Sequence, residues 1–255
     1  MPPIAKVTFT GVLPHGVTGK DVIVALSGLF NEDQVLNHAI EFVGSAETMQ
    51  SLSVDARLTI ANMTTEWGAL SGLFPIDSVL EGWLRGRATV AAMNQSMDLT
   101  GALSPQRFSH KRIDDLYANP MSADKGATYA KHLFLNLATL TPHVAGPNSV
   151  KLATPLSELT KQDIKIDKAY LVSCTNSRAS DLAAAAQVFK NARANGEVTE
   201  IPHSVKFYIA AASKPEQEAA EDAGDWQVLL DAGATELPCG CGPCIGLVRD
   251  HHKIP

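Results

Sequence analysis

The sequence predicts an α/β protein in which parallel strands alternate with helices. Strand, helix, strand and helix patterns follow one another within the first 75 residues, and the same alternation returns after residue 167. This order favours parallel sheets, because each helix returns the chain to the starting edge of the sheet. With 45% hydrophobic and 19% charged side chains among 255 residues, the chain can bury a sizeable core.

The first part of the chain opens on alternating polar and apolar side chains. Residues 6–13 show this period of two, which is typical of a half-buried strand. Thr18 then caps a helix that runs to Leu29, and Asp21 stands three positions on, as in a capping box. Residues 39–44 predict a second strand.

The middle of the chain is less regular. Residues 51–70 have helical periodicity, whereas residues 85–125 mix charge, Pro and Ser and indicate short helices and loops between two domains. Residues 127–140 predict mixed strand and helix, followed by a segment rich in turns. We therefore expect one α/β domain with an irregular linker over residues 1–120 and part of a second α/β domain over residues 121–255.

The last part of the chain has the clearest pattern. Strands are expected at residues 168–173 and 205–211, and helices at residues 178–189 and 226–232. A further helix is capped by Ser213, with Glu216 in the capping-box position. Parallel α/β sheets bind ligands at the carboxyl ends of their strands. Cys174 and the later cysteines are expected at that edge.

Charge and length exclude several kinds of partner. The formal net charge is −6, from 21 Lys and Arg against 27 Asp and Glu, and without a basic stripe we expect no nucleic-acid partner. No run of 18 apolar residues occurs, so we expect no membrane span. The N-terminal residues resemble neither a signal peptide nor a transit peptide.

Three of the four cysteines crowd together at Cys239, Cys241 and Cys244. The Gly-Pro pair between the last two favours a tight turn, which would bring two thiolates to one metal centre. Cys174 lies 67 positions before Cys241, at a second strand end. Three thiolates suit an iron–sulfur cluster with one open iron, whereas structural zinc needs a fourth ligand, from Cys239 or a nearby histidine. Spacing alone leaves metal ligation, a redox dithiol and buried cysteines open.

Cys-Gly-Pro-Cys is also the active-site motif of thioredoxins. There the motif opens a long helix and most of the domain follows it. Only 11 residues follow Cys244 here, and the usual Trp does not lead into the motif. The redox dithiol is therefore the weaker hypothesis.

Asn62 and Glu66 stand four positions apart and would share one face of the helix expected over residues 51–70. A carboxylate among apolar neighbours could serve as a tuned base or hold a metal-bound water. The residues alone favour the simpler interpretation that Glu66 lies on the solvated face. Arg178, close after Cys174, could meet an anionic ligand but is more simply a surface side chain of a helix.

Two motifs together resemble the aconitase superfamily: Ser-Cys-Thr-Asn-Ser-Arg at residues 173–178 and Gly-Cys-Gly-Pro-Cys-Ile-Gly at residues 240–246. Residues 59–69 resemble that family's Asn-Met-x-x-Glu-x-Gly helix. Residues 146–151 and 169–174 are most similar to the fungal branch of the family that serves lysine biosynthesis by the aminoadipate route. The resemblance covers essentially the whole chain.

The resemblance implies an aconitase-like fold of three-layer α/β domains with mainly parallel sheets. It also implies a [4Fe–4S] cluster held by Cys174, Cys241 and Cys244. The open iron would act as a Lewis acid toward the hydroxyl and carboxylate of a small tricarboxylic acid. Glu66 matches a residue near the iron-bound hydroxyl, and Asn62 matches a neighbour of the cluster. The implied reaction is a dehydration and rehydration in the mitochondrial matrix, and Cys239 is not a ligand position.

The family has parts that we do not find in this chain. They are a preceding domain with His and Asp or Ser site residues, a later Asn-Arg motif, and a mobile final domain that supplies Arg and Ser. We therefore expect a central fragment whose own catalysis is absent or very weak. The rival activities are those of 3-isopropylmalate dehydratase and aconitase, and the rival of another class is a non-catalytic fragment that binds zinc or a partner. The sequence predicts no oligomeric state.

Overall fold

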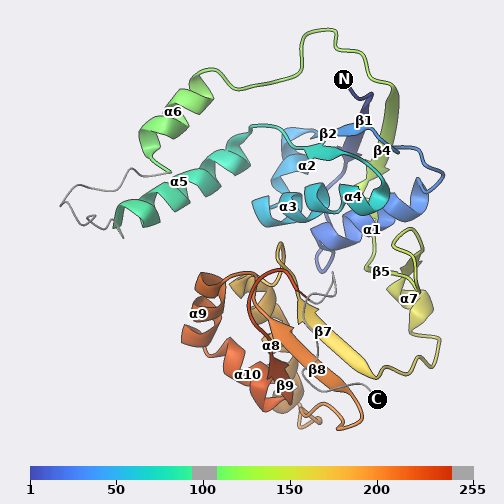
Figure 1. Cartoon of the computed structure of the whole chain (residues 1–255), viewed down its shortest axis with the longest axis vertical. Helices are drawn as coiled ribbons and strands as arrows, with labels where there is room; N and C mark the ends of the chain where they lie inside the picture. The colour runs from blue at the N-terminus through green and yellow to red at the C-terminus, as the bar shows by residue number, and fades with distance from the viewer. Residues whose placement is uncertain (94–107, 243–255) are drawn as a thin grey trace. The chain divides into compact units, whose positions relative to one another are not determined.

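The computed structural model describes residues 1–93 and 108–242, and the chain divides into two compact units (Figure 1). The first unit extends to Lys161 and the second begins at Gln162. Both larger sheets are parallel, so the expected α/β class with mainly parallel sheets is confirmed. The family domain boundary expected between residues 120 and 121 stays a prediction. The boundary between the compact units lies later in the sequence, because residues 131–136 pair with the first strand and so belong to the first unit.

The first unit is built on a four-stranded parallel sheet in the order β3-β2-β1-β4. Its strands are β1 (Ile4–Thr10), β2 (Ala39–Gly44), β3 (Ser71–Leu73) and β4 (Lys131–Asn136). Along β1 the side chains of Ala5, Val7 and Phe9 are fully buried, whereas the residues between them are only partly covered. The alternation predicted for this strand therefore selects the face of the sheet that forms the core.

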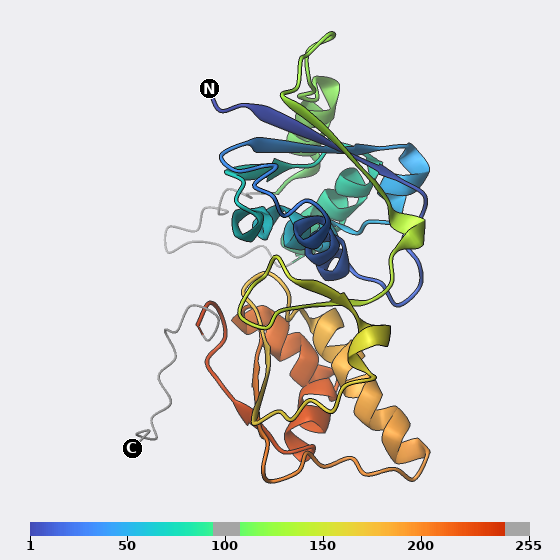
Figure 2. The same ribbon diagram turned by 90° about the vertical axis from the view of Figure 1, so that its right-hand side faces the viewer.

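Helices α1 (Gly19–Leu29) and α3 (Val54–Asn62) contribute to the same core as that buried face, on one side of the sheet (Figure 2). The short helix α2 (Ala46–Gln50) precedes α3. Helix α1 begins as expected, because the Thr18 N–H donates to Asp21 Oδ2 at 2.7 Å within a capping box.

The helix expected over residues 51–70 is wrong as a single element. Helix α3 ends at Asn62, and the next residue (φ −80°, ψ 2°) leads into the separate turn α4 (Thr64–Trp67), which contains Glu66. The break lets Trp67 enter the core, where its Nε1 donates to the Phe30 carbonyl at 2.9 Å. Asn62 and Glu66 therefore do not share the face of one continuous helix.

The region expected to be irregular, residues 85–125, contains much of one long helix and all of another. They are α5 (Ser78–Met93) and α6 (His110–Ala118). Arg85 of α5 donates to Asp114 of α6 at 2.7 Å. Gly82 and Gly86 interrupt the apolar pattern of α5 and lower its helix propensity, which explains why periodicity alone missed it.

Two helical glycines differ in the space beside their Cα atoms and give a first prediction. A Cβ on Gly19 would lie 2.6 Å from the Ala56 carbonyl oxygen, which belongs to the backbone of α3, whereas a Cβ on Gly82 would meet nothing within 4 Å. We expect Gly19→Ala to lower the free energy of unfolding by about 1–3 kcal/mol, because α1 and α3 must separate. Gly82→Ala should raise it by about 0.4–1 kcal/mol in the same urea titration. Equal effects of the two substitutions would contradict this account.

Residues 127–140 form strand β4 and a short 3₁₀ helix (Leu137–Thr139), as the mixed pattern predicted. The turn-rich segment that follows contains a small antiparallel pair that was not expected, β5 (His143–Ala145) and β6 (Ala153–Pro155), before the single turn α7 (Leu156–Leu159). The His143 N–H donates to Asp21 Oδ1 at 2.8 Å, so this pair is fixed to the start of α1.

The second unit has a three-stranded parallel sheet in the order β7-β8-β9 and follows the predicted β-α-β-α pattern. Its elements are β7 (Lys168–Val172), α8 (Ala179–Ala194), β8 (Lys206–Ala210), α9 (Lys214–Asp222), α10 (Asp225–Asp231) and β9 (Ala234–Glu236). Their fully or nearly buried side chains include Leu182, Ile209, Trp226 and Leu229. No helix in the described part of the chain is long and apolar enough to span a membrane.

Candidate functional site

Two of the predicted cysteine ligands lie at one edge of the sheet of the second unit. Cys174 follows β7 and Cys241 follows β9, and both residues are exposed. Because β7, β8 and β9 are parallel, their carboxyl ends share an edge, with β8 in the middle. The two segments therefore lie on either side of the end of β8, at the edge where such sheets bind ligands.

Hydrogen bonds to two consecutive residues fix both cysteine segments to the end of β8. The Ala211 carbonyl accepts from the Gly240 N–H at 2.9 Å, one residue before Cys241. The Ala212 N–H donates to the Ser177 carbonyl at 3.0 Å, in the turn that contains Cys174. One short stretch of backbone thus binds the segments of two cysteines that stand far apart in sequence.

The turn at Cys174 is closed by the side chain that precedes it. Ser173 Oγ accepts from the Thr175 N–H at 3.0 Å and from the Asn176 N–H at 2.8 Å, which folds the chain back just after β7. Ser177 then adopts a positive φ of 54° and is 3% exposed. The turn therefore presents Cys174 to solvent while its far end is buried.

Arg178 and Glu216 join this turn to α9. Arg178 Nε donates to the Thr175 carbonyl at 3.0 Å, and Nη1 donates to Glu216 Oε1 at 3.2 Å. The other oxygen of Glu216 accepts from the Ala179 N–H at 2.9 Å, at the start of α8. The predicted capping box of Ser213 and Glu216 is wrong, because Ser213 makes no side-chain cap bond and the Glu216 carboxylate is bound to α8. Arg178 is an ion-paired side chain rather than a plain surface arginine.

The other two cysteines differ from this pair. Cys239 is partly buried and packs against the hydrophobic core of the second unit, whereas Cys174 and Cys241 are exposed. Cys244 lies outside the described residues. Among the residues that are described, no three His, Cys, Asp or Glu side chains group together so that they could hold a metal ion.

Asn62 and Glu66 lie on the surface of the first unit, and both are exposed. The exposure of Glu66 agrees with the simpler interpretation from the residues. The catalytic role of Glu66 and the place of Asn62 beside the cluster stay predictions.

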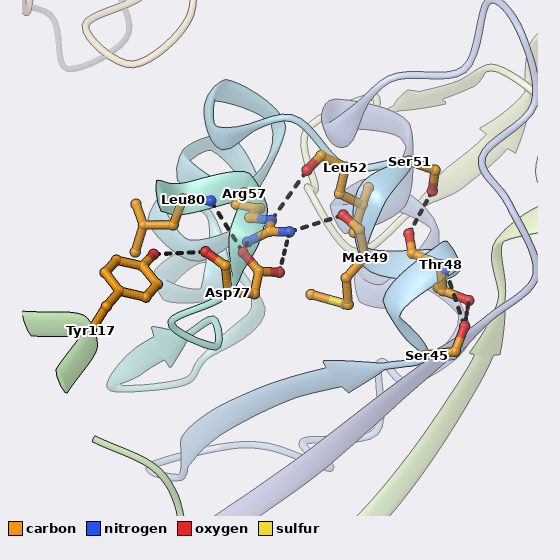
Figure 3. A network of polar contacts seen from close by, with 9 residues as sticks. All are labelled: Ser45, Thr48, Met49, Ser51, Leu52, Arg57, Asp77, Leu80 and Tyr117. Carbon is orange, nitrogen blue, oxygen red and sulfur yellow. Dashed lines mark hydrogen bonds and ion pairs between the residues drawn. The ribbon is translucent and has the colours of Figure 1, made fainter. Parts of the chain in front are cut away.

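A buried ion pair in the first unit was not anticipated from the sequence. Arg57 is 5% exposed and donates to both carboxylate oxygens of Asp77 at 2.8 Å. Figure 3 shows its guanidinium between Asp77 and the carbonyls of Met49 and Leu52, to which it donates at 2.9 and 3.1 Å. Tyr117 Oη donates to the Asp77 carbonyl at 2.6 Å, which ties α6 to the pair.

The Asp77 carboxyl is held ionised by this arrangement. Burial opposes its ionisation, but the hydrogen bonds from Arg57 and from the Leu80 N–H outweigh that effect and lower the pKa of Asp77 below its ordinary value. Arg57 and Asp77 stand 20 positions apart, with neither motif nor periodicity to connect them. The contacts indicate a structural role, since the pair joins α3 to the start of α5.

The first unit also has an open concavity at the carboxyl ends of β1 and β2. Its volume is about 390 Å³, and none of the predicted site residues lines it. The polar side chains among its lining residues are Lys6, Thr8, Thr10, Ser45 and Thr48.

The chain is an α/β protein with parallel sheets and two cysteine segments at one sheet edge. Comparison with known proteins shows the family to which it belongs. The chain belongs to the aconitase family: residues 1–253 match that family, described as aconitate hydratase. The family resemblance inferred from the cysteine motifs is therefore confirmed.

The most similar relatives include mitochondrial homoaconitases of fungi. Those of Aspergillus niger and Emericella nidulans are each 70% identical to this chain over 249 residues, which cover 97% of this chain and 32% of the relative. The mitochondrial homoaconitase of Cryptococcus neoformans is 55% identical over 252 residues, or 97% of this chain and 33% of the relative. The chain spans about a third of the length of these curated relatives.

Proposed function

We propose that this chain is the part of a homoaconitate hydratase that carries the ligands of an iron–sulfur cluster. The proposed enzyme is a hydro-lyase of lysine biosynthesis by the aminoadipate route, which interconverts homocitrate, cis-homoaconitate and homoisocitrate. Its substrate would be a small tricarboxylic acid, and its compartment the mitochondrial matrix, in line with the names of the relatives. The activity is proposed for a protein of the relatives' full length.

The observation that carries the proposal is the attachment of both cysteine segments to Ala211 and Ala212. Thiolates are the ligands that iron–sulfur clusters require, and the exposed Cys174 and Cys241 fit that donor set. The start of α8 lies just after the Cys174 turn, and a helix N-terminus stabilises a nearby thiolate or anionic cluster. Cys244 would be the third ligand.

When bound, the cluster supplies a Lewis-acidic iron that polarises the hydroxyl and carboxylate of the substrate. Within this chain, the three cysteines would hold the cluster and Asn62 would lie beside it. Glu66 would exchange a proton with the substrate near its hydroxyl group, as the family resemblance implies.

Anaerobic reconstitution of the purified chain with ferrous iron and sulfide tests the proposal. We expect visible absorption and about four irons per chain, as a [4Fe–4S] cluster requires. A colourless protein that retains one zinc ion would favour the structural-metal alternative and contradict the proposal, and so would a chain that binds no metal. For a full-length protein, rates with homocitrate, citrate and 3-isopropylmalate would then separate the three activities of the family.

A further inference from the structure

Arg178 ends the first cysteine motif, but its ion-pair partner Glu216 lies in none of the motifs that resemble the family. The pair nevertheless contacts the turn that contains Cys174, a proposed cluster ligand. We propose that Arg178 and Glu216 are positioning residues for Cys174: together they hold the turn in the shape that presents the thiolate to the cluster. The inference rests on the proposed function for the cluster itself. The contacts that carry it are those of this chain alone.

The guanidinium of Arg178 spans the turn. Its Nε bonds the carbonyl of Thr175, the residue next to Cys174, and its Nη1 bonds Glu216 on α9. The side chains of Arg178 and Glu216 are 22% and 18% exposed, so the pair is partly shielded from solvent. Salt screens a partly buried pair of charged groups less than an exposed pair. Hydrogen bonds between such groups are therefore stronger than those on an open surface.

Glu216 contributes a second connection. While Oε1 accepts from Arg178, Oε2 accepts from the Ala179 N–H, which is one of the unpaired donors at the first turn of α8. Both oxygens are therefore used, and the carboxylate fixes the turn and the start of α8 to α9 at once. A glutamate that capped its own helix through Ser213 could not do this.

Other hydrogen bonds hold the turn at its start and at its end. They are the bonds to Ser173 Oγ within the turn and the bond between Ser177 and Ala212 at its end. These bonds join the turn to β7 and β8, whereas the Arg178–Glu216 pair joins it to α9. Loss of the ion pair should therefore leave the fold of the second unit intact while allowing the Cys174 turn to open more often.

Glu216→Gln tests this with little change in shape, because the amide oxygen can still accept from Ala179 while the negative charge toward Arg178 is lost. Glu218→Gln is the matched control, since Glu218 lies on the same helix, is 58% exposed and forms a long ion pair with Lys214 at 3.9 Å. We expect amide hydrogen exchange at Asn176 and Ala212 to become about tenfold faster in Glu216→Gln, the factor that corresponds to the loss of one charge-assisted hydrogen bond. Exchange in Glu218→Gln should be unchanged.

The same variants are then reconstituted. We expect Glu216→Gln to lose its cluster to a chelator about tenfold faster than the parent chain, with an altered electron paramagnetic resonance signal. Arg178→Gln should lose its cluster at least as fast, because it also gives up the bond to the Thr175 carbonyl, and the double variant should be no worse than Arg178→Gln. Unchanged exchange and unchanged cluster loss in Glu216→Gln would overturn the positioning role. If exchange accelerates as expected but the parent chain never binds a cluster, the proposed function fails and the bracing of the turn stands.

Discussion

Replacement of Cys174 by Ser is expected to abolish the visible absorption of the reconstituted chain, whereas replacement of Cys239 by Ser is expected to leave about four irons bound. The two residues differ in what surrounds them. Cys174 is exposed at the carboxyl end of β7, on a turn that is hydrogen-bonded to the end of β8. Cys239 packs against the hydrophobic core of the second unit. Absorption spectra with iron and sulfide analysis of both variants provide the measurement.

The comparison separates ligation from folding. Because Cys174 is exposed and a serine hydroxyl is smaller than the thiol, cluster-free Cys174→Ser should unfold at the same urea concentration as the cluster-free parent chain. Cys239→Ser places a hydroxyl against apolar side chains and should unfold somewhat earlier, although it keeps the cluster. The opposite pattern of iron binding, with Cys239 required and Cys174 dispensable, would refute the proposed ligand set.

The strands and helices that were predicted well are those whose signal is local. The strand before Cys174 and the helix after it appear as β7 and α8, because a short apolar run and a capped, alanine-rich segment need no distant partner to be recognised. The capping box of Thr18 and Asp21 is local in the same sense and is present. The placement of Cys174 at the end of a strand followed from these signals.

The features that were missed depend on residues far apart in the chain. Helix α3 ends at Asn62 because Trp67 turns inward to the Phe30 carbonyl, 37 positions away. Glu216 bonds Arg178 and Ala179 across the sheet edge instead of its own helix cap. A sequence pattern describes the propensity of each segment, but it does not say which of two available partners a carboxylate will choose once the segments pack.

The largest effect on stability is expected from Arg57→Ala, which removes one partner of a buried ion pair. The Asp77 carboxylate would lose both of its bonds from the guanidinium, and the carbonyls of Met49 and Leu52 would lose their donor. Breaking such a pair from one side leaves the carboxylate of Asp77, which is 23% exposed, without its guanidinium. We therefore expect the free energy of unfolding of the first unit to fall by about 3 kcal/mol, the lower end of the range for buried pairs. Native-state hydrogen exchange of the Val7 amide, in the central strand β1, measures this quantity for the first unit.

Arg87→Ala is the control for this substitution, since Arg87 is an exposed arginine of α5 whose guanidinium lies 5.0 Å from the ring centroid of Trp83. Its loss should cost no more than about 1 kcal/mol, the usual strength of an exposed cation–π contact. Arg57→Met with Asp77→Leu removes both charges and should recover much of the stability lost in Arg57→Ala, because buried ion pairs are often replaceable by apolar side chains of similar volume. If Arg57→Ala costs as little as Arg87→Ala, the pair does not hold α5 to α3, and the junction must depend on the apolar contacts around it.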